Sequence, residues 1–232
     1  MLKRLITKIF NLDKRLIEAA HNRDVRKINW YLNIGADIHA CDDYSLCWAA
    51  ENGHIETVKL LLSRGADIHA RNNYTIRWAS SNGHIETVKL LLDRGADIHA
   101  NSDEDLRYAS RNGHTETVKL LLDRGADIHA NDDCSLRWTS LNGRIEIVKL
   151  LLDRGADIHA RDDEALRWAS KSGHAETVNF LEEHLASLEL KNKPITIKEE
   201  NWGIEITERF NLEAVNCDEE IKELRKIVNG RN

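Results

Sequence analysis

Histidine is the residue of this sequence with the clearest potential for metal binding or acid–base chemistry. The sequence contains eleven histidines. Packed helices of neighbouring repeats are about 8–10 Å apart, whereas each ligand of a zinc ion lies about 2 Å from it. Equivalent histidines of successive repeats therefore cannot share a metal, and we expect them to be structural. Those that recur at thirty-residue intervals in loops are His39, His69, His99, His129 and His159.

Acidic residues gather in the same loops, where calcium binding is the alternative to consider. The loops lack the glycine and the ligand spacing of a calcium-binding loop. An Asp directly before a helix is a common N-cap, so we predict that these residues cap helices. The clusters are Asp42–Asp43, Asp103–Glu104–Asp105, Asp132–Asp133 and Asp162–Asp163.

No set of residues indicates catalysis. The sequence has no nucleophile elbow, no phosphate-binding glycine loop, and no Ser or Cys with a dedicated His partner. The cysteines, Cys41, Cys47, Cys134 and Cys217, show neither metal-ligand spacing nor a pairing pattern. We therefore expect reduced thiols, no cofactor, no enzyme activity and an intracellular location in the cytoplasm.

These residues recur because the chain is built from one repeated unit. The stretch 82–100 is nearly copied from Asn52, Asn112 and Asn142 onward, and weakly from Ser172. Such a period is typical of a solenoid. Five equivalent glycines set the period at thirty residues: Gly35, Gly65, Gly95, Gly125 and Gly155.

Each unit has the pattern of two helices. Ile76, Ala79 and Ser80 are spaced at i, i+3 and i+4, which predicts a short first helix ending at Gly83. Val88, Leu91 and Leu92 repeat this spacing in a second helix, which ends at Gly95. Neither helix can bury its apolar stripe alone, so successive units must stack around a continuous core.

The repeat resembles the ankyrin repeat. The run from Asn82-Gly83-His84 through Val-Lys-Leu-Leu-Leu to Gly95-Ala-Asp-Ile-His99 is similar to the second half of that motif, over roughly residues 12 to 185. The period is thirty rather than about thirty-three, and Tyr74-Thr75-Ile76-Arg77 replaces the family's Thr-Pro-Leu-His. We therefore expect shortened finger loops. This Trp-containing variant also resembles ankyrin repeats abundant in large DNA viruses, which would place the protein in the host cytoplasm.

The resemblance implies roles for two further sets of residues. It implies that His54, His84, His114 and His174 tie neighbouring turns together by hydrogen bonds. It also implies that a protein partner binds in the concave groove and at the fingers. The resemblance further implies that an ankyrin loop with a Leu upstream of Asp-Ile-Asn can be hydroxylated there. Here Leu92 precedes the similar stretch Asp97-Ile98-His99. A substrate of a loop-modifying hydroxylase is therefore an alternative function.

We predict an all-α fold with three parts. An N-terminal capping helix covers 1–11, although a membrane-surface helix is the alternative there. A solenoid of about six units covers 12–185. Residues 186–232 form a C-terminal cap of a small hairpin, with Ile195 and Ile197 on one strand and Ile204 and Ile206 on the other, and a helix over 218–228. The alternative for this last part is a tail that itself recruits a partner.

Composition narrows the class of partner. The formal charge of −6 argues against nucleic acid, whose phosphates need a basic footprint. No stretch approaches the eighteen apolar residues of a membrane span. We therefore expect a monomer that binds another protein.

One helical face carries candidate binding residues. At 100° per residue, Trp78 points about 150° away from the centre of the apolar face. It belongs to what we call the aromatic row: Trp48, Trp78, Tyr108, Trp138 and Trp168. Beside it runs the arginine row: Arg77, Arg107, Arg137 and Arg167. Tyr44 and Tyr74 lie at the adjoining loops.

We predict a non-catalytic scaffold or adaptor that binds a protein through this groove and the loop tips. The alternative is architectural. The rings could fill the space left by the shortened fingers.

Overall fold

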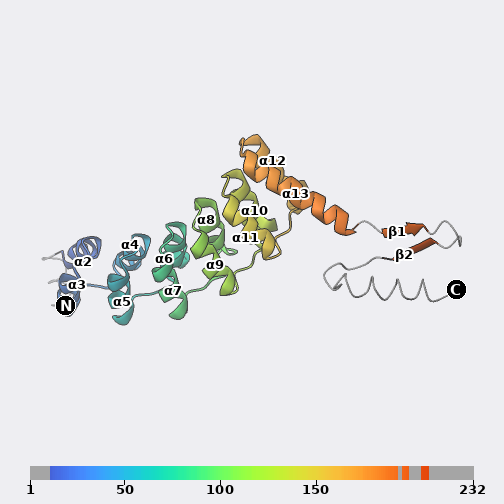
Figure 1. The fold of residues 1–232 in the computed structure, drawn as a ribbon. Coiled ribbons are helices and arrows are strands. Elements are labelled where there is room, and N and C mark those ends of the chain that lie inside the picture. Colours follow the sequence, from blue (N-terminus) through green and yellow to red (C-terminus); the bar gives the residue numbers. More distant parts are fainter. Residues whose placement is uncertain (1–10, 193–194, 199–204, 209–232) are drawn as a thin grey trace. The chain divides into compact units, whose positions relative to one another are not determined.

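The computed structural model describes residues 11–192, 195–198 and 205–208 (Figure 1). The chain divides into two compact units, Met1–Val178 and Asn179–Asn232. The first unit contains the repeats.

Each of the first five repeats is a pair of antiparallel helices, and these helices form two layers (Figure 1). The predicted all-α stack is thereby confirmed. The first helices are α2 (Leu12–His21), α4 (Tyr44–Glu51), α6 (Ala70–Ser81), α8 (Glu104–Asn112), α10 (Ala130–Leu141) and α12 (Ala160–Lys171). The second helices are α3 (Val25–Asn33), α5 (Ile55–Ser63), α7 (Ile85–Asp93), α9 (Thr115–Asp123), α11 (Ile145–Asp153) and α13 (Ala175–Asn192), the last of which continues into the second unit.

The core lies between the layers and runs through successive repeats. Leu46, Ile76 and Leu106 of the first helices are fully buried, as are Leu61 and Leu91 of the second helices. Neighbouring first helices pack more closely than neighbouring second helices. Such packing bends the stack toward the first-helix layer, whose outer surface is therefore the concave one.

A left-handed turn, rather than a hairpin finger, begins each first-helix segment of repeats 2 to 6. It precedes α4 and α8, and it interrupts α6, α10 and α12 directly after their first residue. Three successive non-glycine residues adopt φ between 51° and 59° in every turn. Left-handed residues normally occur singly, and Asn and Asp tolerate them best. Residues 11–192 contain no β-strand, which agrees with the expected shortening of the fingers. The turns are 41–43, 71–73, 101–103, 131–133 and 161–163.

The prediction that the loop aspartates cap helices was wrong. Asp43 and Asp103 precede α4 and α8 but make no side-chain cap hydrogen bond, because the left-handed backbone turns their carboxylates away. Asp43 instead accepts a hydrogen bond from the backbone N–H of Asp67, at 2.9 Å. Asp103 and Asp133 accept equivalent bonds from Asp127 and Asp157. These aspartates hold the following loop in place.

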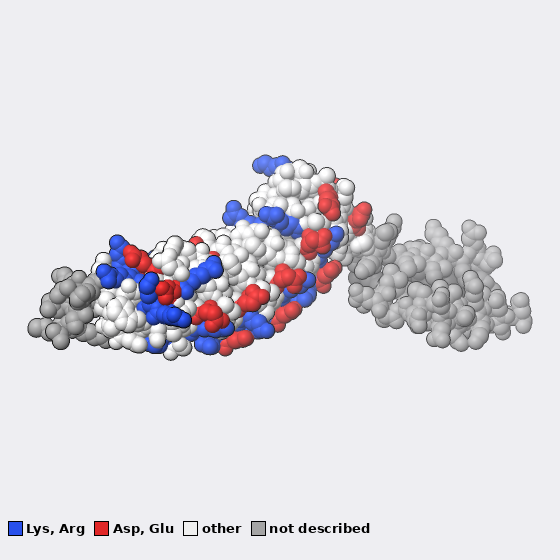
Figure 2. Space-filling model, turned by 60° about the vertical axis from the view of Figure 1, so that its left-hand side comes forward, with Lys and Arg blue, Asp and Glu red and all other residues white. Residues whose placement is uncertain are grey.

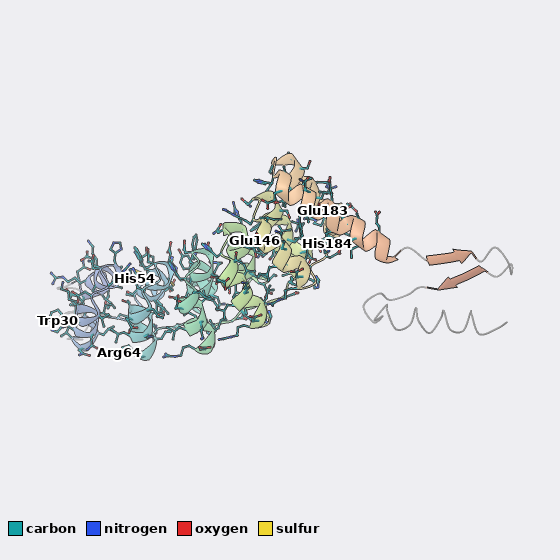
Figure 3. All side chains as sticks on the ribbon, viewed as in Figure 1. Trp30, His54, Arg64, Glu146, Glu183 and His184 are labelled. Atoms are coloured by element: carbon teal, nitrogen blue, oxygen red, sulfur yellow. The ribbon has the colours of Figure 1, made fainter. Side chains whose placement is uncertain are left out.

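The first repeat exposes apolar side chains at the end of the stack. Trp30 of α3, labelled in Figure 3, is 54% exposed, and Val25 and Ile34 are also exposed. The capping helix predicted over 1–11 would cover such an end. Residues 1–10 lie outside the described part of the chain, so this stays a prediction.

The second unit contains the predicted hairpin. Strands β1 (Ile195–Lys198) and β2 (Glu205–Glu208) pair antiparallel, with Ile197 opposite Ile206. The helix predicted over 218–228 lies outside the described residues. The predicted domain limits of 1–11, 12–185 and 186–232, and the docking of the last part as a cap, stay predictions.

Candidate binding surface

The aromatic row lies on the outer surface of the first helices. Trp78 is the most exposed of the five rings, at 37%, and the other four are half-buried. The rings are therefore partly accessible and also contribute to packing. Tyr108 and Trp138 lie next to each other, with ring centroids 6.0 Å apart.

The arginine row holds the left-handed turns. The Nη2 atoms of Arg107, Arg137 and Arg167 donate hydrogen bonds to the backbone carbonyls six residues earlier, at distances of 2.8–3.0 Å. Arg137 also donates through Nε to the carbonyl of Asp132, at 2.9 Å. In the left-handed turns of repeats 4 to 6 the arginine therefore satisfies a carbonyl. Sequence reasoning missed this role, because the direction of a carbonyl follows from the turn and not from residue spacing.

Two of these arginines are also ion-paired with the next repeat. Arg77 pairs with Glu104 at 2.7 Å, and Arg137 pairs with Glu164. Arg137 is only 4% exposed. The structure thus places Arg137 inside the stack and leaves Arg107 and Arg167 as the unpaired members of the row.

Arginines also cover the rings of the following repeat. The guanidinium of Arg107 lies 5.8 Å from the Trp138 ring centroid, and that of Arg137 lies 5.6 Å from Trp168. Such stacking is favourable because the ring face is electronegative. In repeat 2, Cys47 stands where the later repeats have this arginine, so no equivalent arginine of the preceding repeat covers Trp78.

Tyr44 and Tyr74 lie beside Arg71 of the left-handed turn. The guanidinium of Arg71 is 5.4 Å from the Tyr44 ring and 5.6 Å from the Tyr74 ring. The Tyr74 hydroxyl donates to Glu51 at 3.3 Å. Burial, together with the Glu51 charge, raises the pKa of Tyr74.

The histidines form two structural sets. The implied ties between turns are confirmed for His84, His114 and His174, whose Nε2 atoms donate to a carbonyl of the preceding repeat at 2.9–3.0 Å. The second set lies in the exposed loops, where each Nδ1 bonds a residue four positions later. In this set, the hydrogen bond that His39 donates to the Asp43 carboxylate raises the pKa of His39.

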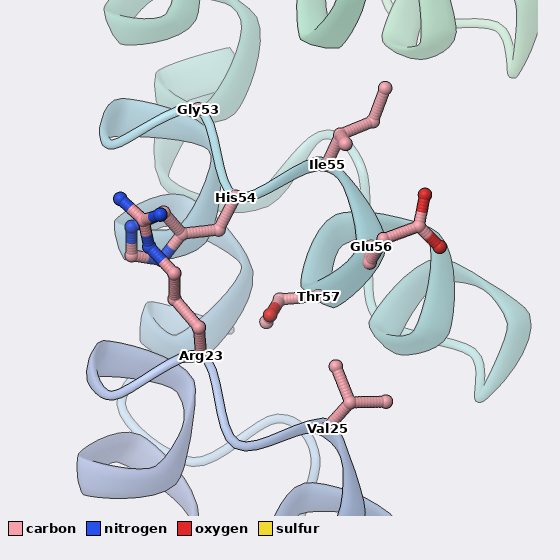
Figure 4. A pocket seen from close by; sticks show the side chains of 7 residues that line it. All are labelled: Arg23, Val25, Gly53, His54, Ile55, Glu56 and Thr57. Carbon is pink, nitrogen blue, oxygen red and sulfur yellow. The ribbon is translucent and has the colours of Figure 1, made fainter.

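His54 lies in a small cleft near the first end of the stack. Its neighbours there include Arg23, Val25 and Thr57 (Figure 4). Its Nδ1 is buried without a hydrogen-bond partner, and burial lowers the pKa of the imidazole. Arg23 stands where later repeats have glycine and lies beside the imidazole, so it closes one side of the cleft.

The described residues contain no group of three or more His, Cys, Asp or Glu side chains able to hold a metal ion. Cys41, Cys47 and Cys134 are free thiols, and Cys217 lies outside the described part. No helix within the described ranges is long and apolar enough to cross a membrane.

Comparison with known proteins agrees with the architecture. A family model described as Ankyrin repeats (3 copies) matches residues 16–102 and again 106–192, which together form most of the chain. A search of curated proteins found no match.

Proposed function

The chain belongs to the ankyrin-repeat family, and from this membership we propose that it is a non-catalytic adaptor that binds a partner protein across its first-helix surface. Ankyrin repeats are generally protein-interaction modules. The proposed contact residues are the aromatic row, the arginine row apart from the buried Arg137, and Tyr44 and Tyr74. We place this activity inside the cell, in the cytoplasm, with the protein as a monomer.

One observation carries the proposal. Aromatic rings that recur along the concave surface remain partly exposed. Trp, Tyr and Arg are enriched among the residues that dominate binding energy at interfaces. A partner would therefore find a continuous line of such anchors.

A second feature supports selectivity for one partner. Three residues after each ring, the side chain changes from repeat to repeat. It is acidic in repeat 2, small in repeat 3, apolar in repeat 5 and basic in repeats 4 and 6. We call these positions the variable row: Glu51, Ser81, Arg111, Leu141 and Lys171. Constant anchors beside variable neighbours suit recognition of one particular surface.

Photo-crosslinking tests the proposal. In one variant of the full chain a benzoylphenylalanine replaces Trp78 on the first-helix surface, and in a second it replaces Lys89 on the second-helix surface. Each variant is irradiated in an extract of the cells in which the protein naturally occurs. We expect one partner adduct from position 78 and none from position 89. Equal adducts from both positions would contradict the assignment of the surface.

Trp78→Ala separates binding from packing. Because Trp78 is 37% exposed and is not covered by an arginine of the preceding repeat, the variant should unfold at nearly the wild-type temperature while its partner binding weakens. A large loss of thermal stability without any partner would show that the row is architecture.

A further inference from the structure

Basic charge is concentrated on the first helices of repeats 4 to 6 and on the turns that follow them. None of the five basic residues there forms an ion pair with a described carboxylate. Four of them are exposed, and Arg107 is half-buried. We call these five residues the basic cluster: Arg107, Arg111, Arg144, Arg167 and Lys171.

The acidic residues of the same helices do not neutralise the basic cluster. Glu104 and Glu164 are already paired with Arg77 and Arg137. Asp105 is 1% exposed. The exposed acids near these helices, Asp132 and Asp162, belong to the left-handed turns instead.

Apolar surface lies within the basic cluster. Leu141 of α10 is 37% exposed, one helical turn after Trp138. The guanidinium of Arg111 lies 5.4 Å from the Trp138 ring centroid. An arginine that stacks on a ring can still donate its N–H groups to a carboxylate.

The second-helix surface has a different charge pattern. Basic and acidic side chains alternate along the lower edge in Figure 2. Many of them are paired, as in Arg124 with Asp93 and Arg154 with Asp123. That surface therefore has little unbalanced charge to offer a partner.

We propose that the basic cluster binds an acidic segment of the partner protein, with an apolar side chain of that segment against Leu141 and Trp138. This proposal rests on the proposed adaptor function and adds the place and the chemistry of recognition. A basic region on a chain of net charge −6 directs an acidic ligand to that region and away from the rest of the molecule. The negative net charge also opposes nucleic-acid binding, because a nucleic acid is longer than the basic cluster and its remaining phosphates would be repelled by the rest of the chain.

The test uses three fluorescein-labelled probes and the full-length chain. The probes are the peptide (Glu-Glu-Leu)5, the neutral peptide (Gln-Gln-Leu)5 and a fifteen-nucleotide oligouridylate. Binding is followed by fluorescence anisotropy. The acidic peptide should bind more tightly than both other probes, and its affinity should fall as salt screens the charges.

The variant is Arg111→Gln/Lys171→Gln, which removes two charges of the basic cluster. The control is Lys89→Gln/Arg94→Gln, which removes two exposed basic charges of the second-helix side that form no ion pair with described residues. Because each exposed charge pair contributes only modestly to affinity, the loss of two such pairs should weaken binding of the acidic peptide about tenfold, and the control should weaken it less than twofold. Equal losses in the two variants would show a net-charge effect and overturn the proposal. So would equal binding of the neutral peptide or of the oligouridylate.

Crosslinking at Leu141 distinguishes this proposal from the adaptor function. Mass spectrometry of the adduct identifies the partner segment that lies there. A partner adduct at Trp78 together with a segment at Leu141 that is not acidic would overturn the proposed chemistry and leave the adaptor function standing. Absence of adducts at both positions would contradict the adaptor function itself.

Discussion

The two helix layers of the stack differ in how much their sequences vary. The second helices α5, α7, α9 and α11 nearly repeat one sequence, with Val-Lys-Leu-Leu-Leu in all four. The first helices keep their buried positions but change in charge and size on the exposed face. This difference fits our proposal, in which the second layer is the scaffold and the first layer carries recognition.

The largest expected effect comes from the layer of second helices, which we call the constant layer because its sequence nearly repeats. Leu121 of α9 is fully buried, and its removal leaves a cavity between repeats. Leu121→Ala should therefore lower the free energy of unfolding by about 2–5 kcal/mol, measured by urea denaturation. The control is Lys119→Ala on the same helix. An unchanged midpoint for Leu121→Ala would contradict the assignment of this layer as the core.

The glycine that ends a first helix offers a sharper test, because a matched glycine ends the second helix. A Cβ at Gly83 would lie 2.4 Å from the Nδ1 of His114, whereas a Cβ at Gly95 would meet nothing within 4 Å. Both residues have positive φ. Gly95→Ala should thus cost about 1–2 kcal/mol from backbone strain alone.

Gly83→Ala should cost clearly more than Gly95→Ala, because the clash adds to the strain. It should also displace His114 from the carbonyl of Ser81, which it contacts at 2.9 Å. Thermal unfolding of the two variants measures the difference. Equal costs would mean that the histidine tie contributes nothing.

A third prediction concerns Asp105 of the first helix α8. Both of its carboxylate oxygens are buried without a hydrogen-bond partner. Burial raises the pKa of Asp105 well above its usual range; Asp103, Glu104 and Asp97 raise it further, and only Arg77 opposes them. The native state therefore keeps a proton that the unfolded state has already lost.

Stability linked to Asp105 is consequently greatest below the unfolded pKa, near 4, and falls as the pH rises through the folded pKa. Ser135 occupies the equivalent position of the next repeat. Asp105→Ser should stabilise the protein by about 1–3 kcal/mol at pH 8 and by less at pH 4, measured by urea denaturation at both values. A gain that did not depend on pH would contradict an ionisable origin.

Much of the stack could be predicted from the sequence because its causes are local. The thirty-residue period, the i, i+3, i+4 stripes and the terminal glycines set helix pairs that must pack together. The hairpin around Ile197 and Ile206 likewise followed from alternation. Each of these patterns depends on residues close together in the chain.

What could not be predicted depends on backbone direction and on neighbours in space. The sequence Asn131-Asp132-Asp133 gives no sign of three consecutive left-handed residues, so the aspartates were misassigned as helix caps. The hydrogen bonds of Arg137 follow from the carbonyls of that same turn. Its burial follows from both the turn and the next repeat, and spacing along the chain shows neither.

The smallest expected effect concerns the ion pairs of the constant layer. Lys119 lies 2.8 Å from Glu116 one helical turn away, but their side chains are 45% and 69% exposed. Water screens such a pair, and holding two long side chains together costs entropy. Lys119→Ala should therefore change the free energy of unfolding by less than about 0.5 kcal/mol, measured by urea denaturation at low and high salt. A larger, salt-sensitive loss would mean that the alternating charges of the second helices stabilise the stack. The second helices would then keep a constant sequence for their surface ion pairs as well as for their buried leucines, and the contrast between the two layers would no longer rest on the core alone.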